Sequence, residues 1–273
     1  MRKNSILNVI LVGAGVCIVC STVVSTAAVA LKDIIERNRV LEQRRNILVA
    51  AGVIAPGETA DVNELFQQKI TPKIVDLHSG QWVDDVDPAT FDARKAAKDP
   101  KTSEKLPEAE DIAGLKRIAK YREVYLYEQN GQLKRLVLPV RGMGLWSTMR
   151  GFVALAADLN TIENLSFYEH GETPGLGGEI DNPRWRQKWK GKKAFDKQGD
   201  VEIRVVKGTV NPSSPESIYE VDVLSGATIT SRGVTNLLHF WLGQQGYGPL
   251  IDRLRDEARP PKVAAVEFKR DEP

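Results

Sequence analysis

The first 31 residues contain a long stretch without charge, which constrains the chain more than any other feature. No charged residue occurs between Asn4 and Leu31, and most of the side chains in this stretch are apolar. A helix needs about 20 apolar residues to cross the hydrocarbon core of a membrane, and a longer helix can tilt. Residues 1–31 therefore predict a short N-terminus followed by one transmembrane helix.

The same stretch has a second interpretation, as a secretory signal that is removed. Arg2 and Lys3 would form its basic start, and Ala28-Val29-Ala30 has the small residues of a cleavage site. The apolar run is longer than the roughly 7–15 residues usual for such a signal, which favours a retained anchor.

The charges around the span do not decide its orientation. The basic residues that follow it outnumber the two that precede it, and they are Lys32, Arg37, Arg39, Arg44 and Arg45. The positive-inside tendency would keep the following body in the cytoplasm, but long domains cross membranes largely regardless of such charges.

The rest of the chain is electrically balanced and poor in metal ligands. Of 38 basic residues two precede the span, so 36 remain against 36 acidic residues. This balance argues against nucleic-acid binding, which needs a basic excess. Both cysteines, Cys17 and Cys20, lie within the span, and the three histidines lack the i, i+4 spacing of a zinc-binding helix. The sequence therefore predicts no metal site and no thiolate-bound cluster in the body.

The segment between the span and residue 120 predicts little regular structure beyond two helices. Residues 32–51 form an amphipathic, charged pattern that ends before Pro56-Gly57, and residues 62–70 form a shorter one before Pro72. The polar segment 84–120, which contains three prolines, predicts irregular structure with short helices and no part in the core.

The C-terminal half predicts strands followed by a helix. Residues 124–128 and 133–140 flank Asn130-Gly131, the sequence of a type I′ hairpin turn, and residues 151–157 and 161–168 form a second pair. Residues 201–206 predict a fifth strand. A final helix would bury Val234, Leu237, Leu238, Trp241 and Leu242 and end at Gly243. The expected fold class is α+β, an antiparallel sheet with flanking helices, plus the N-terminal transmembrane helix.

Two glycine-containing loops are candidates for binding a ligand. Gly175, Gly177 and Gly178 lie in a loop beside His170. A second loop, Ser225-Gly226-Ala227-Thr228, runs into the final helix, for which Thr230 or Ser231 would be the N-cap. A phosphate would be favoured just before this helix by the free N–H groups and the helix dipole. A capped helix with nothing bound explains the loop equally well.

A resemblance to a known family favours the phosphate. The residues Asp222-Val-Leu-Ser-Gly-Ala-Thr228 match the pattern recognised by the bacterial flavin transferase, which moves FMN from FAD onto the final threonine as a phosphoester. Nearly the whole chain resembles the C subunits of sodium-translocating NADH:quinone oxidoreductases. The segments that carry this resemblance are residues 46–52, 74–80, 138–147, 167–178, 182–185 and 224–231. The G subunit of Rnf-type electron-transport complexes shares the flavin motif, but residues 144–147 and the region up to about Lys120 look more like a C subunit.

The resemblance implies roles for individual residues. Thr228 would carry covalent FMN, while Asp222, Ser225, Gly226 and Ala227 would be read by the transferase. Ser225, Gly226 and Ala227 would then hold the phosphate. The remaining FMN contacts would come from Trp146, Glu172, Thr173, Gly175, Leu176, Gly177 and Lys207. No residue of the chain would be catalytic by itself.

The resemblance also implies a location and partners. The chain would be a single-pass protein of the bacterial inner membrane, with residues 32–120 and the FMN-binding domain 121–273 forming one periplasmic body. Its partners would be the other subunits of the complex and, during maturation, the flavin transferase. The alternatives are the G-subunit role in an Rnf-type complex, a released periplasmic flavoprotein, and a structural membrane subunit without flavin.

Overall fold

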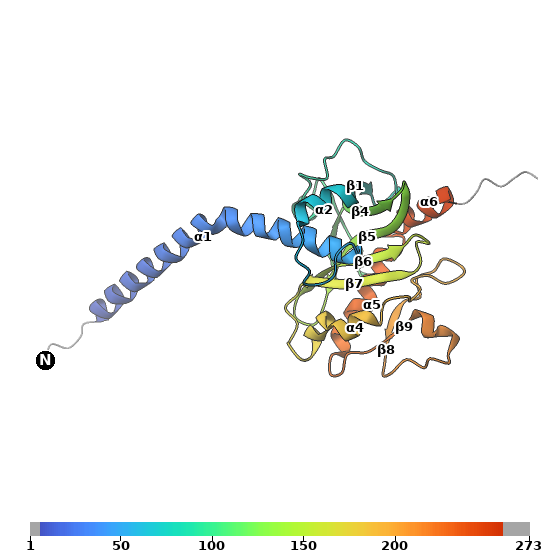
Figure 1. The fold of residues 1–273 in the computed structure, drawn as a ribbon. Coiled ribbons are helices and arrows are strands. Elements are labelled where there is room, and N and C mark those ends of the chain that lie inside the picture. Colours follow the sequence, from blue (N-terminus) through green and yellow to red (C-terminus); the bar gives the residue numbers. More distant parts are fainter. Residues whose placement is uncertain (1–5, 259–273) are drawn as a thin grey trace, which may run out of the picture. The chain divides into compact units, whose positions relative to one another are not determined.

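A computed structural model describes residues 6–258, and these divide into two compact units between Arg45 and Asn46 (Figure 1). The first unit holds most of helix α1 (Ile6–Ala50). Within the described residues, α1 is the one helix long and apolar enough to cross a membrane, and its most apolar part is exposed. The expected N-terminal apolar helix is thus present, and it continues without a break into the charged segment.

The second unit, hereafter the body, is built on a five-stranded antiparallel sheet. Its strand order is β1-β4-β5-β6-β7 (Figure 1). The strands are β1 (Ile70–Asp76), β4 (Tyr121–Gln129), β5 (Gln132–Met143), β6 (Thr148–Ala156) and β7 (Ile162–Glu169). Asn130 and Gly131 have φ angles of 54° and 71°, as a type I′ turn requires. The sheet with flanking helices and the β4–β5 hairpin are confirmed.

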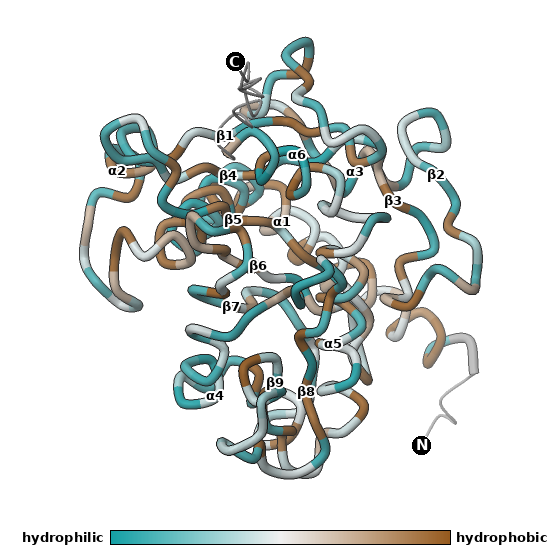
Figure 2. Tube along the Cα trace, turned by 90° about the vertical axis from the view of Figure 1, so that its right-hand side faces the viewer, coloured by the Kyte–Doolittle hydropathy of each residue, from teal (hydrophilic) through white to brown (hydrophobic). Residues whose placement is uncertain are grey.

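Helices cover both faces of the sheet. One face packs against α5 (Thr228–Leu242) and α6 (Gly248–Ala258), and all five side chains predicted for the buried stripe of α5 are buried. The other face packs against Ile47 and Leu48 at the end of α1 and Val62 of α2 (Val62–Lys69). Hydrophilic and hydrophobic segments alternate along α2 and α6 (Figure 2), which suits helices with one buried side.

Strand β1 and helix α6 are among the elements of the body that were not predicted from the sequence. Strand β1 was missed because Pro72 was taken to end the preceding helix, whereas Pro72 lies within an edge strand, opposite Tyr125. An edge position tolerates proline because one side of the strand needs no ladder hydrogen bond. Helix α6 follows α5, so α5 is not the final helix; Leu250 and Ile251 bury its apolar side.

Two further sequence predictions were wrong in part. The segment 84–120 contains the expected short helix, α3 (Ala93–Lys98), but also the hairpin of β2 (Ser103–Lys105) and β3 (Arg117–Ala119), and it supplies Ala113 and Ile118 to the core. Residues 201–206 form only the short β8 (Arg204–Val206). This strand pairs in parallel with β9 (Glu220–Asp222) outside the main sheet. Short helical turns complete the body at η1 (Gly177–Asp181), α4 (Pro183–Gln187) and η2 (Pro215–Tyr219).

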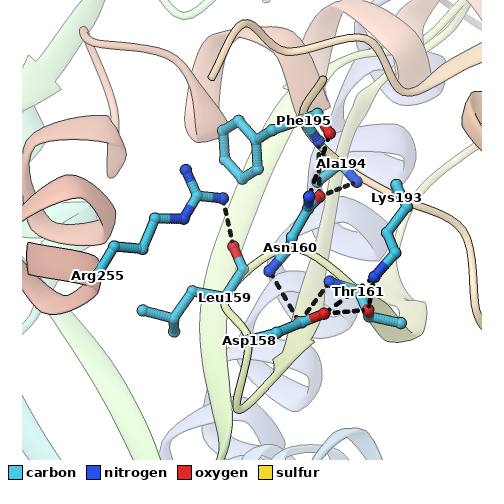
Figure 3. A network of polar contacts seen from close by, with 8 residues as sticks. All are labelled: Asp158, Leu159, Asn160, Thr161, Lys193, Ala194, Phe195 and Arg255. Carbon is cyan, nitrogen blue, oxygen red and sulfur yellow. Dashed lines mark hydrogen bonds and ion pairs between the residues drawn. The ribbon is translucent and has the colours of Figure 1, made fainter. Parts of the chain in front are cut away.

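The β6–β7 turn is tied to two other segments by polar contacts (Figure 3). Asp158 accepts hydrogen bonds from Lys193 Nζ at 3.0 Å and from the Thr161 hydroxyl at 2.5 Å. The Asn160 side-chain oxygen accepts the N–H groups of Ala194 and Phe195, both at 2.9 Å. Arg255 of α6 donates to the carbonyl of Leu159, the residue of the turn with a φ of 54°. These contacts fasten the segment that leads to β8 and β9 onto the sheet.

Candidate functional site

Three segments meet at one edge of the body and form the candidate site. They are the loop 144–147 between β5 and β6, the loop 170–176 that follows β7 together with the start of η1, and the start of α5. Glu172 joins all three segments. It belongs to the loop 170–176, and its carboxylate accepts hydrogen bonds from the loop 144–147 and from α5. The site therefore unites the two loops that the sequence singled out with the segment around Trp146.

Glu172 is buried, with 4% of its surface exposed. Its carboxylate accepts the N–H groups of Leu145 at 3.1 Å, Trp146 at 2.9 Å and Ser147 at 3.3 Å. It also accepts the Thr230 hydroxyl at 2.5 Å. Burial by itself would raise the pKa of Glu172, but these four donors outweigh burial and hold the pKa below its ordinary value. Glu172 thus acts as an ionised clamp between the loop 144–147 and α5.

Acid is expected to loosen this clamp. Since the pKa of Glu172 is lower in the folded protein than in the unfolded chain, the clamp's contribution to stability is complete above the ordinary glutamate pKa of about 4.3. That contribution is lost as the pH falls through the folded pKa. Urea unfolding at pH 7 and at successively lower pH should show a steeper loss of stability for the wild type than for Glu172→Gln. Equal pH dependence of stability in the two proteins would contradict the role of ionised Glu172 as the clamp.

The loop 170–176 is held in place by His170 and Ser147. His170 Nδ1 accepts the N–H of Glu172 at 3.2 Å, and Nε2 lies 2.7 Å from the carboxylate of Asp181. Because Nδ1 is an acceptor, Nε2 carries the proton and donates to Asp181. The N–H of Gly171 donates to Ser147 Oγ at 2.6 Å. His170, which the sequence placed beside this loop, therefore fixes the loop's conformation.

Two glycines of the site are required by geometry. A Cβ at Gly177 would lie 2.5 Å from Thr230 Oγ1 and 2.8 Å from Glu172 Oε2. Only glycine therefore lets the backbone at this position pass so close to the hydrogen-bonded Glu172 and Thr230 side chains. Gly226 has a φ of +70°, which L side chains rarely adopt. It turns the chain directly before α5, with Leu176 Cδ2 3.0 Å from the position of a Cβ.

Helix α5 begins earlier than the sequence predicted. Its N-cap is Ala227 and its first residue is Thr228, rather than an N-cap at Thr230 or Ser231. The two expected capping side chains are used elsewhere: the Thr230 hydroxyl donates to Glu172, and Ser231 Oγ accepts the N–H of Leu224 at 3.2 Å. Within residues 6–258 no side chain caps this helix. Thr228 therefore lies exposed at a helix start whose first N–H groups are available for an anion.

Large exposed apolar side chains lie on the three segments that form the site. Trp146 is 67% exposed, Leu176 45% and Ile229 55%. Trp146 shares the Glu172 clamp with α5, and Leu176 contacts the Gly226 turn. Exposed apolar groups on segments that meet at an uncapped helix start suit a ligand with a flat apolar part and a phosphate. Thr173 and Gly175 lie exposed in the same loop as Leu176.

Asp222, at the end of β9, and Lys207, directly after β8, lie outside the loops 144–147 and 170–176 and outside α5. The carboxylate of Asp222 pairs with Lys188 and accepts the N–H of Val210 at 2.7 Å. Burial would raise its pKa, but these contacts, Lys188 foremost, lower it. Lys207 follows β8 directly, with an exposed side chain, and belongs to neither loop of the cluster. Ser225 is exposed at the turn before α5.

Several contacts that shape the site were not predicted from the sequence. Ser147, Thr230, Asp181 and Lys188 make their contacts with residues distant in the sequence, at separations of 11 to 58 residues. No local pattern indicates such pairs.

Comparisons with known proteins match this region and the whole chain. Residues 144–243 match the family described as the FMN-binding domain. The C subunit of the Na(+)-translocating NADH-quinone reductase of Pseudomonas aeruginosa is 51% identical over 255 residues, which cover 93% of this chain and 98% of that protein. The corresponding protein of Yersinia pestis is 46% identical over 259 residues, covering 94% and 96%.

A solved structure agrees with these sequence matches. The crystal structure of Shewanella oneidensis NqrC superposes with a TM-score of 0.72 at 37% identity, covering 79% of this chain and 97% of that one. The range matched by the FMN-binding domain contains the loop 144–147, the loop 170–176 and all of α5.

Proposed function

The chain belongs to the family of C subunits of the Na⁺-translocating NADH-quinone reductase and contains an FMN-binding domain, and from this we propose that it carries FMN in phosphoester linkage to Thr228. In this role it relays electrons within the complex. A bound flavin supplies the capacity to carry electrons singly or in pairs. The chain's own residues bind and orient it.

The exposed hydroxyl of Thr228 at an uncapped helix start is the observation that carries the proposal. The phosphoester oxygens would accept the first N–H groups of α5, where the helix dipole favours negative charge. Ser225, Gly226 and Ala227 would form the turn beside the phosphate.

The isoalloxazine ring would rest on the exposed apolar side chains near Thr228. Trp146 and Leu176 are the main candidates, with Thr173, Gly175 and Gly177 along the loop. Glu172, whose carboxylate has four protein donors, would act by holding the loop 144–147 and α5 in place. Lys207 is the more distant candidate, suited to a contact with the outer edge of the cofactor.

Attachment requires a transferase, and the chemistry of the step follows from the linkage. The bond between the FMN phosphorus of FAD and its AMP portion breaks as a bond to Thr228 Oγ1 forms, and the hydroxyl proton leaves with AMP. Asp222, Ser225, Gly226, Ala227 and Thr228 would be the residues that the transferase reads. A covalent link suits a compartment with little flavin, where a reversibly bound cofactor could be lost.

Fluorescence of the denatured protein tests this proposal. On a denaturing gel, protein made in a host that contains the flavin transferase is expected to give a fluorescent band, because a phosphoester survives unfolding. A dark band from such a host would rule out covalent flavin.

The same proposal sets the body in the periplasm, with α1 crossing the inner membrane once. The body has no cysteine, since Cys17 and Cys20 lie in the apolar part of α1. Lys197→Cys, at an exposed turn residue, is therefore expected to react with a membrane-impermeant maleimide added to cells with a permeabilised outer membrane. Labelling only after the inner membrane is lysed would place the body in the cytoplasm and contradict the proposed orientation. The unsubstituted protein is the control.

A further inference from the structure

Arg232 is a cation that the contacts of the site leave unused. It lies on α5, four residues after Thr228, and its side chain is exposed. Within the described residues 6–258 it makes no hydrogen bond and no ion pair. Its guanidinium has five N–H donors and no acceptor, so all of them remain open to an anionic ligand.

The helix places Arg232 beside Thr228. Residues four apart on a helix have Cβ atoms about 5–6 Å from each other. Side chains on a helix also lean toward its N-terminus, so we expect the guanidinium of Arg232 to extend toward the turn that contains Thr228. A group attached to Thr228 Oγ1 is therefore within reach of Arg232.

The acids of the site are not available to Arg232. Glu172 is buried and its carboxylate already accepts four hydrogen bonds. Asp222 is paired with Lys188 and with the N–H of Val210. An anion that arrives with the cofactor would be the natural partner. A phosphodiester keeps one negative charge at neutral pH and presents two free oxygens, which match the forked donors of a guanidinium.

We propose that Arg232 binds the free oxygens of the phosphoester at Thr228 and so restricts how the flavin is oriented. This inference rests on the proposed function, because it needs the phosphate to be attached at Thr228. The helix start binds the phosphate from one side through N–H groups, and Arg232 binds it from the next turn of the same helix. Two sets of donors limit rotation about the ester bonds and keep the ring over Trp146 and Leu176.

Phosphorus NMR of the purified, flavin-bearing full-length protein tests the contact directly. The variants are Arg232→Gln, which removes the charge, and Arg232→Lys, which keeps it. Lys69→Gln is the matched control, since Lys69 is an exposed cation of α2, on the face of the sheet away from α5. The phosphoester resonance is expected to shift in Arg232→Gln, to shift less in Arg232→Lys and to stay unchanged in Lys69→Gln.

Urea unfolding of the same proteins, with and without flavin, gives a second measurement. Flavin-free protein of each sequence comes from a host that lacks the transferase. The rise in urea midpoint that flavin causes should be smaller in Arg232→Gln than in wild type, by roughly 0.2–0.5 M, and unaltered in Lys69→Gln.

The outcomes distinguish the role of Arg232 from the proposed flavin linkage at Thr228. A wild-type phosphoester resonance that does not move in Arg232→Gln, with the same midpoint gain, would overturn the role of Arg232 and leave the flavin linkage standing. Absence of the resonance from all of the proteins would overturn both.

Discussion

Thr228→Ala is expected to abolish covalent flavin and, with it, quinone reduction by the assembled complex. Alanine has no hydroxyl, so no phosphoester can form. The fold should survive, because Thr228 is exposed at the first position of α5 and alanine has the higher helix propensity. The fluorescent band on a denaturing gel should disappear, while the urea midpoint of the variant matches that of flavin-free wild type.

Thr228→Ser is the matched control for this substitution. It keeps a hydroxyl at the same position, so it is expected to retain a fluorescent band. Full band intensity in Thr228→Ala would mean that another residue carries the flavin. Loss of the band together with a urea midpoint below that of flavin-free wild type would mean that the substitution acts by destabilising the fold.

Glu172→Ala is expected to be the most destabilising single substitution in the site, at about 3–4 kcal/mol. It removes the acceptor of three backbone N–H groups and of the buried Thr230 hydroxyl. Each donor left without a partner in a buried place adds to the cost. Urea unfolding of the flavin-free full-length protein, followed by tryptophan fluorescence, measures the loss without a contribution from the cofactor.

The control for the clamp is an exposed glutamate. Glu128→Ala, at an exposed position of β4, should change the free energy of unfolding by no more than about 0.5 kcal/mol. Glu172→Gln should fall between the two, because its amide keeps one acceptor oxygen but turns an NH₂ group toward donors. A value for Glu172→Ala close to that of Glu128→Ala would show that the four hydrogen bonds do not hold the site together.

The sheet was predictable where the information was local. Asn130-Gly131 specifies a hairpin because few residues tolerate two successive positive φ angles, and the strands on either side follow from their apolar pattern. Strand β1 could not be found in this way, since Pro72 argues for an interruption and only the pairing with β4 makes it an edge strand. Its existence depends on a partner about 50 residues away.

The start of α5 illustrates the same limit. Thr230 and Ser231 have the side chains of an N-cap, and local chemistry alone favours them. In the folded protein their hydroxyls bind Glu172 and the N–H of Leu224, so the helix begins at Thr228 instead. The tertiary contacts outweigh the capping preference, and they leave the helix start free for a ligand.

The sequence indicates the proposed attachment point but not the contacts that support the site. The motif that ends at Thr228 is a linear pattern, so the sequence contains it whole. The clamp of Glu172, the His170–Asp181 contact and the Asp222–Lys188 pair arise from chain crossings that no linear pattern specifies. Glu172, which the sequence predicts as a flavin contact, also positions two segments of the site.

Tandem mass spectrometry of the proteolytic peptide that contains Thr228, from the native complex, tests the central claim most directly. We predict a mass increase equal to FMN less one water, with fragment ions that assign it to Thr228. An unmodified Thr228 peptide from active complex, or the same adduct on another residue, would contradict the proposed linkage.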